Sequence, residues 1–157
     1  MKIIVVSFFS LMYFSGLCQS PENGNWIVTL VVDGDTFYAA KDNIEKKFRL
    51  IGIDAPESCH PNRPLEPFAI ESKTWLENLV SDSKIRLEFD GQRTDRYGRH
   101  LVYAFNRDGT FVNRNLLESG LAAVMTIPPN VKYLEILIES TEKAKFNKLG
   151  IWRVNNE

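Results

Sequence analysis

Three short polar runs in this chain carry groups that could cleave a phosphodiester bond. They are Asp33-Gly34-Asp35-Thr36, Asp54-Ala55-Pro56-Glu57 and Asp95-Arg96-Tyr97-Gly98-Arg99, with Arg49 between the first two. Carboxylates are hard ligands for a divalent cation, a positioned carboxylate can take a proton from an attacking water, and guanidinium groups can neutralise charge on a phosphate. The residue types and their order therefore predict a metal-assisted site for phosphodiester cleavage.

Each run taken alone would be weak evidence for such a site. Asp-Gly pairs are among the commonest turn formers, and Asp54 with Glu57 would by itself indicate an ordinary loop. Arg49 stands among apolar residues of an expected strand, where a charge must point outward or be paired, since burying it alone is very costly. The interpretation depends on all three runs falling at the ends of strands that one small barrel would bring together.

Hydrophobic patterning predicts five short strands. The expected strands cover residues 26–32, 36–39, 48–53, 85–89 and 101–105. A tight Asp33-Gly34-Asp35 corner separates the first two, and the polar stretch 41–43 forms a hairpin turn before the third. In the last two strands every second residue is apolar, so each is expected to bury one face.

Three helices are expected at about residues 68–79, 112–119 and 131–147. The first follows Pro67, and Gly120 would cap the end of the second. Their apolar faces are expected to hold Phe68, Trp75, Leu76 and Leu79 in the first helix and Leu134, Leu137, Ile138, Thr141 and Ala144 in the third. Together these elements predict a β-rich α+β fold, a five-stranded OB-fold barrel with three helices, in one domain.

The first 18 residues have the composition of a secretory signal peptide. Lys2 precedes an apolar run from Ile3 to Phe14, which is shorter than the roughly 20 residues of a membrane span. We expect cleavage after Cys18, which leaves a single mature domain at residues 19–157, secreted or periplasmic, monomeric and without stable membrane association. The alternative is a lipid-modified Cys18, which the bulky Leu17 disfavours.

Composition excludes several kinds of site. Without Lys2 the mature chain has 18 basic and 20 acidic residues, so attraction to nucleic acid would have to come from a local cluster. Such a cluster is present at Arg93, Arg96, Arg99 and His100. With two histidines and one mature cysteine, Cys59, the mature chain can form neither a zinc ligand set nor a disulfide framework.

The polar runs, in this order, resemble those of the staphylococcal nuclease (thermonuclease) family. The resemblance covers roughly residues 28–152 and is carried by Val-Asp-Gly-Asp-Thr, Phe-Arg-Leu, Ile-Asp-Ala-Pro-Glu and Gly-Gln-Arg-Thr-Asp-Arg-Tyr-Gly-Arg. It implies a calcium-dependent nuclease on an OB-fold barrel, which would act on DNA or RNA and leave 3′-phosphate and 5′-hydroxyl ends.

The resemblance also implies a calcium site. Asp35 and Asp54 would be its carboxylate ligands, and the backbone carbonyl of Ala55 would be a third protein oxygen. Asp33 would act on the ion through a bound water. Calcium takes six to eight oxygen ligands and tolerates irregular geometry, so this set suits it.

The remaining implied roles belong to the reaction itself. Glu57 matches the general base, and Arg49 and Arg99 match two arginines that hold the scissile phosphate. Arg96 and Tyr97 match positions that contact the neighbouring phosphate. Guanidinium is a planar fork whose paired N–H groups fit phosphate oxygens, which agrees with the arginine roles on chemical grounds.

Two segments depart from the family pattern. The family's nucleotide pocket uses a pair of tyrosines after the second helix, whereas residues 123–129 here contain no aromatic ring. Since stacking is worth roughly 1–3 kcal/mol per base, weaker nucleotide binding and a flatter base preference are expected. The loop after Glu57 is also shorter, and we interpret His60 in it as a solvated residue.

Two other functions remain open at this stage. Domains with this barrel can bind nucleic acid without cleaving it, although the complete set of Asp35, Arg49, Asp54, Glu57 and Arg99 argues against such a binding module. The second alternative is a secreted structural domain whose charges form surface ion pairs. It would need no calcium, so a thermal-shift titration with calcium and a nucleotide would distinguish it.

Overall fold

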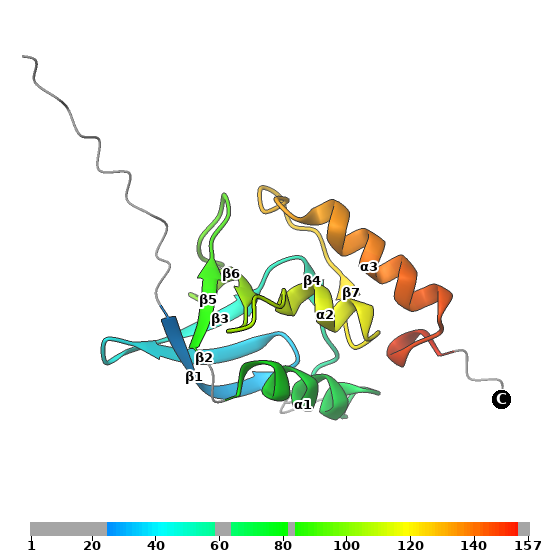
Figure 1. The fold of residues 1–157 in the computed structure, drawn as a ribbon, viewed down its shortest axis with the longest axis horizontal. Coiled ribbons are helices and arrows are strands. Elements are labelled where there is room, and N and C mark those ends of the chain that lie inside the picture. Colours follow the sequence, from blue (N-terminus) through cyan, green and yellow to red (C-terminus); the bar gives the residue numbers. More distant parts are fainter. Residues whose placement is uncertain (1–24, 59–63, 82–83, 154–157) are drawn as a thin grey trace, which may run out of the picture.

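Five strands close into a barrel, as predicted, and their order is β1-β2-β3-β6-β5 (Figure 1). The computed structural model describes residues 25–58, 64–81 and 84–153. The barrel strands are β1 (Asn25–Asp33), β2 (Thr36–Lys41), β3 (Ile44–Leu50), β5 (Lys84–Glu88) and β6 (His100–Phe105). All pairs are antiparallel except β3 with β6, which run parallel. The expected signal peptide and mature amino terminus lie outside the described residues.

The alternation of side chains along β2 and β3 divides the barrel interior from its outer face. Phe37 and Phe48 are paired in register, are fully buried and have ring centroids 5.5 Å apart. Trp26 meets Phe48 edge-on at 4.9 Å. The partners on either side, Thr36 with Arg49 and Tyr38 with Lys47, point to the opposite face. Arg49 therefore lies outside the barrel core although its neighbours in sequence are core residues.

The third strand ends at Leu50, earlier than predicted. Gly52 has a φ of 78°, a conformation that favours glycine, and it turns the chain out of the barrel. The next two residues form β4 (Ile53–Asp54), which pairs with β7 (Ala123–Val124) in a small second sheet that the patterning does not predict. This turn carries Asp54 back toward the corner at Asp35.

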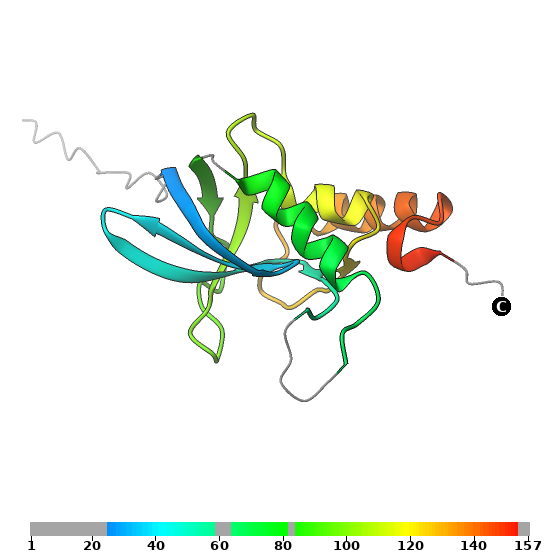
Figure 2. The same cartoon turned by 90° about the horizontal axis from the view of Figure 1, so that it is seen from below.

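Helices α1 and α2 pack on the barrel, and α3 packs on α2 (Figures 1 and 2). They are α1 (Ala69–Val80), α2 (Val112–Glu118) and α3 (Leu134–Phe146), followed by a short 3-10 helix, η1 (Gly150–Trp152). Helix α1 packs on β1, α2 on β6, and α3 on α2. No helix in the described part of the chain is long and apolar enough to cross a membrane.

The apolar faces predicted for α1, α3 and β6 differ in part from those observed, and so does the start of α3. Trp75 and Ile138 are 41% and 45% exposed, and the Trp75 indole N–H donates to the Asn115 side chain at 2.8 Å instead of entering the core. Helix α3 begins at Leu134, later than expected, and the backbone N–H of Lys132 before it donates to the Asp90 carboxylate. Strand β6 does not bury a single face: Val102, Tyr103 and Ala104 are all fully buried, since helices cover its outer side.

The Asp33-Gly34-Asp35 corner is held tightly against α1 and β4. A Cβ on Gly34 would lie 1.8 Å from the Ser72 hydroxyl oxygen and 2.8 Å from the Ala55 side chain. No side chain fits there, so the glycine is required by close packing. The corner thereby fixes both flanking aspartates relative to Ala55.

Candidate active site

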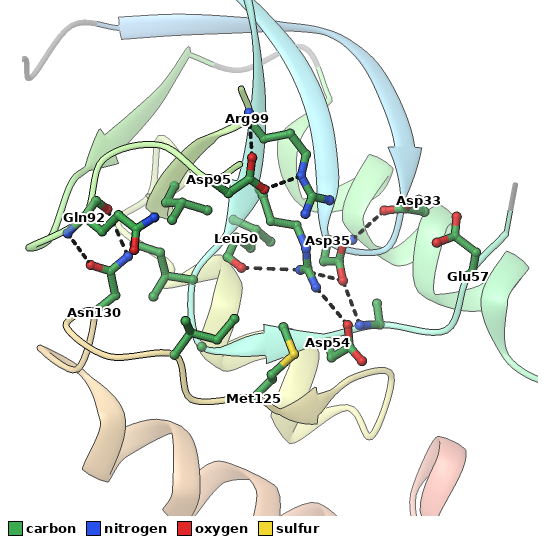
Figure 3. Close-up of a pocket in the computed structure, with 16 residues that line it drawn as sticks. Asp33, Asp35, Leu50, Asp54, Glu57, Gln92, Asp95, Arg99, Met125 and Asn130 are labelled. Atoms are coloured by element: carbon green, nitrogen blue, oxygen red, sulfur yellow. Dashed lines mark hydrogen bonds and ion pairs between the residues drawn. The ribbon is translucent and has the colours of Figure 1, made fainter. Parts of the chain in front are cut away.

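A cavity of about 310 Å³ opens beside this corner, between the outer face of β3, the β4 segment and residues 125–130 (Figure 3). Seven of the nine residues predicted for the site line it: Asp33, Asp35, Arg49, Asp54, Ala55, Glu57 and Arg99. They come from three separate parts of the sequence, as the sequence patterns predict. The two that do not line the cavity are Arg96 and Tyr97.

Arg49 joins the two aspartates at the centre of the cavity. Its Nη1 lies 2.6 Å from an Asp35 oxygen, and its Nη2 donates to Asp54 at 2.8 Å. The same Asp35 oxygen accepts the Ala55 backbone N–H at 2.8 Å, and the other accepts the Thr36 hydroxyl at 2.9 Å. Arg49 and Asp35 are almost fully buried, whereas Asp54 is exposed, so the prediction that Arg49 must be paired is met by two carboxylates.

The site carries more negative than positive charge. Burial raises the pKa of Asp35, the Arg49 guanidinium opposes this rise, and the nearby Asp33 carboxylate adds to it, so the net shift is upward. The Asp33 carboxylate also accepts the backbone N–H of Asp35 at 3.4 Å. Around the Arg49 guanidinium lie the three carboxylates of Asp33, Asp35 and Asp54, so a bound cation would relieve the repulsion between them.

The donor set has the chemistry that calcium requires. The side chains of Asp35 and Asp54 and the carbonyl of Ala55 offer only hard oxygens. Within the described residues no three histidine, cysteine, aspartate or glutamate side chains converge as a metal cluster. An ion held here would therefore complete its coordination with water and substrate oxygens, which calcium tolerates.

Glu57 lies at the edge of the cavity, on the side of Asp33 (Figure 3). Its backbone N–H donates to the Glu66 carboxylate at 2.9 Å, which holds the start of the following loop. Among the described residues its own carboxylate has no hydrogen-bond or ion-pair partner, as a base that receives a proton from water requires. Cys59 and His60, which follow it, lie outside the described residues.

Arg99 is fixed by Asp95, a residue to which the sequence assigned no role. One Asp95 oxygen accepts the backbone N–H groups of Tyr97 and Arg99 at 2.9 and 3.0 Å, and the other accepts Arg99 Nε at 2.7 Å. Burial acts to raise the pKa of Asp95, but these hydrogen bonds from Arg99 and Tyr97 outweigh it and the pKa is lowered. Asp95 thus shapes the turn and aims the arginine.

Arg96 and Tyr97 occupy the outer side of that turn. Tyr97 is 67% exposed, and the Arg96 guanidinium lies 4.8 Å from its ring centroid and donates to its hydroxyl at 2.6 Å. Both residues are close to the cavity in sequence but are not part of its wall. Their contact with a neighbouring phosphate stays a prediction.

The wall opposite the charged residues is aliphatic. It includes Leu101, Met125 and Ile127, with no aromatic residue among the lining side chains. Asn130, which is buried, accepts the Gln92 backbone N–H at 2.7 Å and donates to the Gln92 carbonyl at 2.9 Å, so it ties two loops together at this wall. Sequence patterns missed this pair because its members lie in separate loops that show no motif.

Comparison with known proteins agrees with the geometry. Residues 47–154 match the family model described as staphylococcal nuclease homologue. The chain is 39% identical to a thermonuclease of Staphylococcus intermedius, over 82% of this chain and 76% of that protein. It is 36% identical to a thermonuclease of Staphylococcus hyicus, over 88% and 80%. Endonuclease YncB of Bacillus subtilis is 37% identical, over 77% of this chain and 58% of that protein. The family match, the relatives and the barrel with its charged cavity lead to one conclusion: this chain belongs to the staphylococcal nuclease family.

Proposed function

We propose that the protein is a calcium-dependent phosphodiesterase that cleaves DNA and RNA to 3′-phosphate and 5′-hydroxyl ends. Membership of the staphylococcal nuclease family makes it an enzyme that hydrolyses nucleic acids, and its relatives are named thermonucleases and endonucleases. The observation that carries the finer proposal is the convergence on one cavity of two arginines, two paired aspartates and a glutamate whose carboxylate has no partner in the described part of the chain.

Asp35, Asp54 and the Ala55 carbonyl would hold the calcium ion, with Asp33 acting through a bound water. When bound, calcium supplies a Lewis acid that polarises a phosphate oxygen. The two aspartates are already held at one guanidinium, with contacts of 2.6 and 2.8 Å, so little rearrangement of the backbone is required of them.

The arginines would bind the scissile phosphate. Arg49 reaches the cavity from β3 and Arg99 from the turn before β6, so a phosphate between them meets two planar forks. Charge grows on its oxygens as water adds, and fixed donors of this kind are typically worth roughly 3–4 kcal/mol each at a developing oxyanion. Arg49 would exchange part of its contact with the aspartates for the phosphate.

Glu57 would take the proton from the attacking water. The new bond joins the water oxygen to phosphorus, and the bond from phosphorus to the 5′ oxygen breaks. The 5′ oxygen leaves as a hydroxyl after gaining a proton, and the phosphate stays on the 3′ side. Arg96 and Tyr97 would contact the neighbouring phosphate from the outer side of their turn.

Digestion of single- and double-stranded DNA and RNA tests this proposal. Hydrolysis is expected with calcium, little with magnesium and none in chelator, because magnesium demands tighter octahedral geometry and keeps its waters. End-group analysis should find 3′-phosphates. Full activity in chelator would contradict the site assignment, and calcium-dependent binding without any cleavage would favour the binding-module alternative.

We also propose export as a monomer after removal of residues 1–18. The support is the composition of that segment, with Lys2 before an apolar run. Mass spectrometry of the exported protein should give a chain that starts near Gln19. Its elution volume in size-exclusion chromatography should correspond to a monomer. An intact amino terminus, or a diacylglyceryl mass on Cys18, would overturn the proposal.

A further inference from the structure

A strip of outward-facing side chains continues from the cavity along β1, β2 and β3. Thr36 and Arg49 are cross-strand partners at the cavity, and the next partners on the same face are Tyr38 and Lys47. Leu30 of β1 pairs with Tyr38 and extends the row across a third strand. The row therefore lies directly beside the charged end of the site.

Leu30, Tyr38 and Lys47 are not part of the buried hydrophobic core. Leu30 is 57% exposed, and Tyr38 and Lys47 are half-buried. The Lys47 ammonium lies 5.4 Å from the Tyr38 ring centroid. The ammonium lies over one face of the ring, so a base would stack on Tyr38 as the ammonium turns to a phosphate. Aromatic rings and cations are the groups with which proteins bind single-stranded nucleic acid.

The row is continuous with the surface that the substrate would occupy. Arg49 of β3 pairs with Leu101 of β6, and both line the cavity. Lys47 precedes Arg49 by two residues, and Arg99 precedes Leu101 by two residues. At about 3.3 Å per strand residue, Lys47 lies about 7 Å along the strand from Arg49, which corresponds to one or two nucleotides of a bound strand. Lys47 and Arg49 lie on the same strand, β3.

At the end farthest from the cavity, the row stops at a negatively charged residue. Glu45, two residues before Lys47, is exposed and accepts the Thr29 hydroxyl at 2.6 Å. A carboxylate at this position repels phosphate, so the strip accommodates a short stretch only. The β2–β3 hairpin that carries it projects at the end of the molecule away from α3 (Figures 1 and 2).

We propose that Leu30, Tyr38 and Lys47 form a subsite for the nucleotide that lies one position beyond the two joined by the cleaved bond, in single-stranded DNA or RNA. Lys47 contacts its phosphate, and its base stacks on Tyr38 beside Leu30. The inference rests on the proposed nuclease function and adds a substrate preference to it. A base in a duplex is already stacked and paired, so this subsite selects single strands.

Binding measured without turnover tests the subsite. The probes are a labelled 12-nucleotide single strand and a labelled dinucleotide, followed by fluorescence anisotropy in calcium. The Glu57→Gln background slows cleavage, and the readings are taken before a gel shows any cut probe. Tyr38→Ala should weaken binding of the 12-mer by about 5- to 100-fold, and Tyr38→Phe should retain it. Lys47→Ala should reduce the salt slope by about 0.7, as expected for one phosphate contact on a single strand. The dinucleotide should be bound equally by all variants.

Lys46→Ala is the matched control, because Lys46 is adjacent on β3 but faces the other way, with its ammonium 5.7 Å from the Trp26 ring. Apart from the general effect of removing one positive charge, this variant should leave the affinity for the 12-mer and the salt slope of binding unchanged. Unaltered affinity and slope in folded Tyr38→Ala and Lys47→Ala proteins would overturn the subsite. Since anisotropy needs no cleavage, failure of the wild-type protein to hydrolyse nucleic acid would count against the nuclease proposal alone.

Discussion

Arg49 has to satisfy two demands that compete for the same atoms. Its two terminal nitrogens pair with Asp35 and Asp54, which keeps a buried cation from being left alone. The proposed reaction needs the same nitrogens on a phosphate. In the proposed reaction, Arg49 would contribute to stability when the cavity holds no substrate and to catalysis when it does.

Replacing Arg49 by lysine should therefore affect both properties. Lysine keeps the charge but cannot reach both carboxylates in one plane, so about 1–3 kcal/mol of unfolding free energy should be lost with one charged hydrogen bond. Turnover should fall about 10²- to 10³-fold. Urea unfolding and steady-state kinetics measure the two effects, and Lys46→Arg serves as a control for the reverse exchange on the same strand. Wild-type turnover in Arg49→Lys would remove this residue from the reaction.

Glu57 is the expected base, and its carboxylate has no partner among the described residues. Glu57→Gln should lower kcat by roughly 10²- to 10⁴-fold and leave KM nearly unchanged, because the amide cannot accept the proton but keeps the shape. Glu71→Gln, on α1 and away from the cavity, is the control. Near-normal turnover in Glu57→Gln would mean that another residue is the base, and His60 would be tested next.

The sequence predicted most of the charged site because its residues lie in short local runs. Asp33, Asp35, Asp54 and Glu57 are within a few positions of a turn, and a turn fixes where such side chains lie. Asn130 could not be predicted, since its partner Gln92 is 38 residues away and the contact depends on how two loops meet.

At the scale of elements, the turn from Asp95 to Arg99 positions Arg99, one of the two arginines proposed to bind the scissile phosphate. Asp95→Asn keeps the shape and can still accept the backbone N–H groups, but it loses the charge that holds Arg99 Nε at 2.7 Å. We expect kcat to fall by roughly 10- to 100-fold with little change in stability, because small misplacements of a catalytic group are costly. Kinetics with Asp95→Glu, which restores the charge, should show partial rescue. Equal kcat in Asp95→Asn and wild type would show that Arg99 needs no such support.

The segment that follows β7 contributes the aliphatic wall of the cavity, and the lack of aromatic residues in this wall agrees with the sequence. Met125 and Ile127 are aliphatic and cannot stack as an aromatic ring does. Cleavage of oligonucleotides that differ only in the base at the cut should therefore vary little. Ile127→Tyr should sharpen that preference. A strong preference in the wild type would indicate an aromatic contact elsewhere.

The errors in the predicted elements also have local causes. The third strand was expected to continue to Ile53, but Gly52 in a left-handed conformation ends it and creates β4. Helix α3 was expected to include Lys132, but Asp90 takes its backbone N–H. Neither the conformation of Gly52 nor the hydrogen bond to Asp90 is encoded in the hydrophobic pattern from which these elements were predicted.

Across the whole molecule, the strands of the barrel and the start of α3 are joined by two acidic residues. Glu88 at the end of β5 pairs with Lys132 and accepts the Tyr133 hydroxyl at 3.0 Å, while Asp90 accepts the Tyr103 hydroxyl at 3.0 Å and the Lys132 backbone N–H. Tyr133 packs edge-on against Tyr103 with ring centroids 4.7 Å apart. These contacts hold the segment that contains Asn130 against the barrel.

Both carboxylates should make the fold sensitive to acid. Burial acts to raise the pKa of Glu88, but hydrogen bonds from Lys132, Tyr133 and Arg86 outweigh it; burial likewise acts on Asp90 and is outweighed by donors that include Lys132 and Gly91. Each folded pKa is therefore lowered below the unfolded values of about 4.3 and 3.9.

The sign of the pH dependence follows from these lowered pKa values. Above about pH 5 both groups are ionised in the folded and unfolded chains, and their stabilisation is complete; as the pH falls, the unfolded chain binds protons first and stability is lost. Asp35 acts in the opposite direction, because its raised pKa lets the folded chain bind a proton first. The decline due to Glu88 and Asp90 should therefore be measured by urea unfolding between pH 5 and pH 3, as the difference between the wild type and a variant that lacks both carboxylates. In Glu88→Gln/Asp90→Asn the protein should be less stable at pH 7 and lose less on acidification. Part of the slope should persist, because the pKa values of Asp95 and Glu118 are also lowered, in both cases by hydrogen bonds that outweigh burial. An identical slope in the double variant would show that the junction between β5 and α3 is not where acid acts.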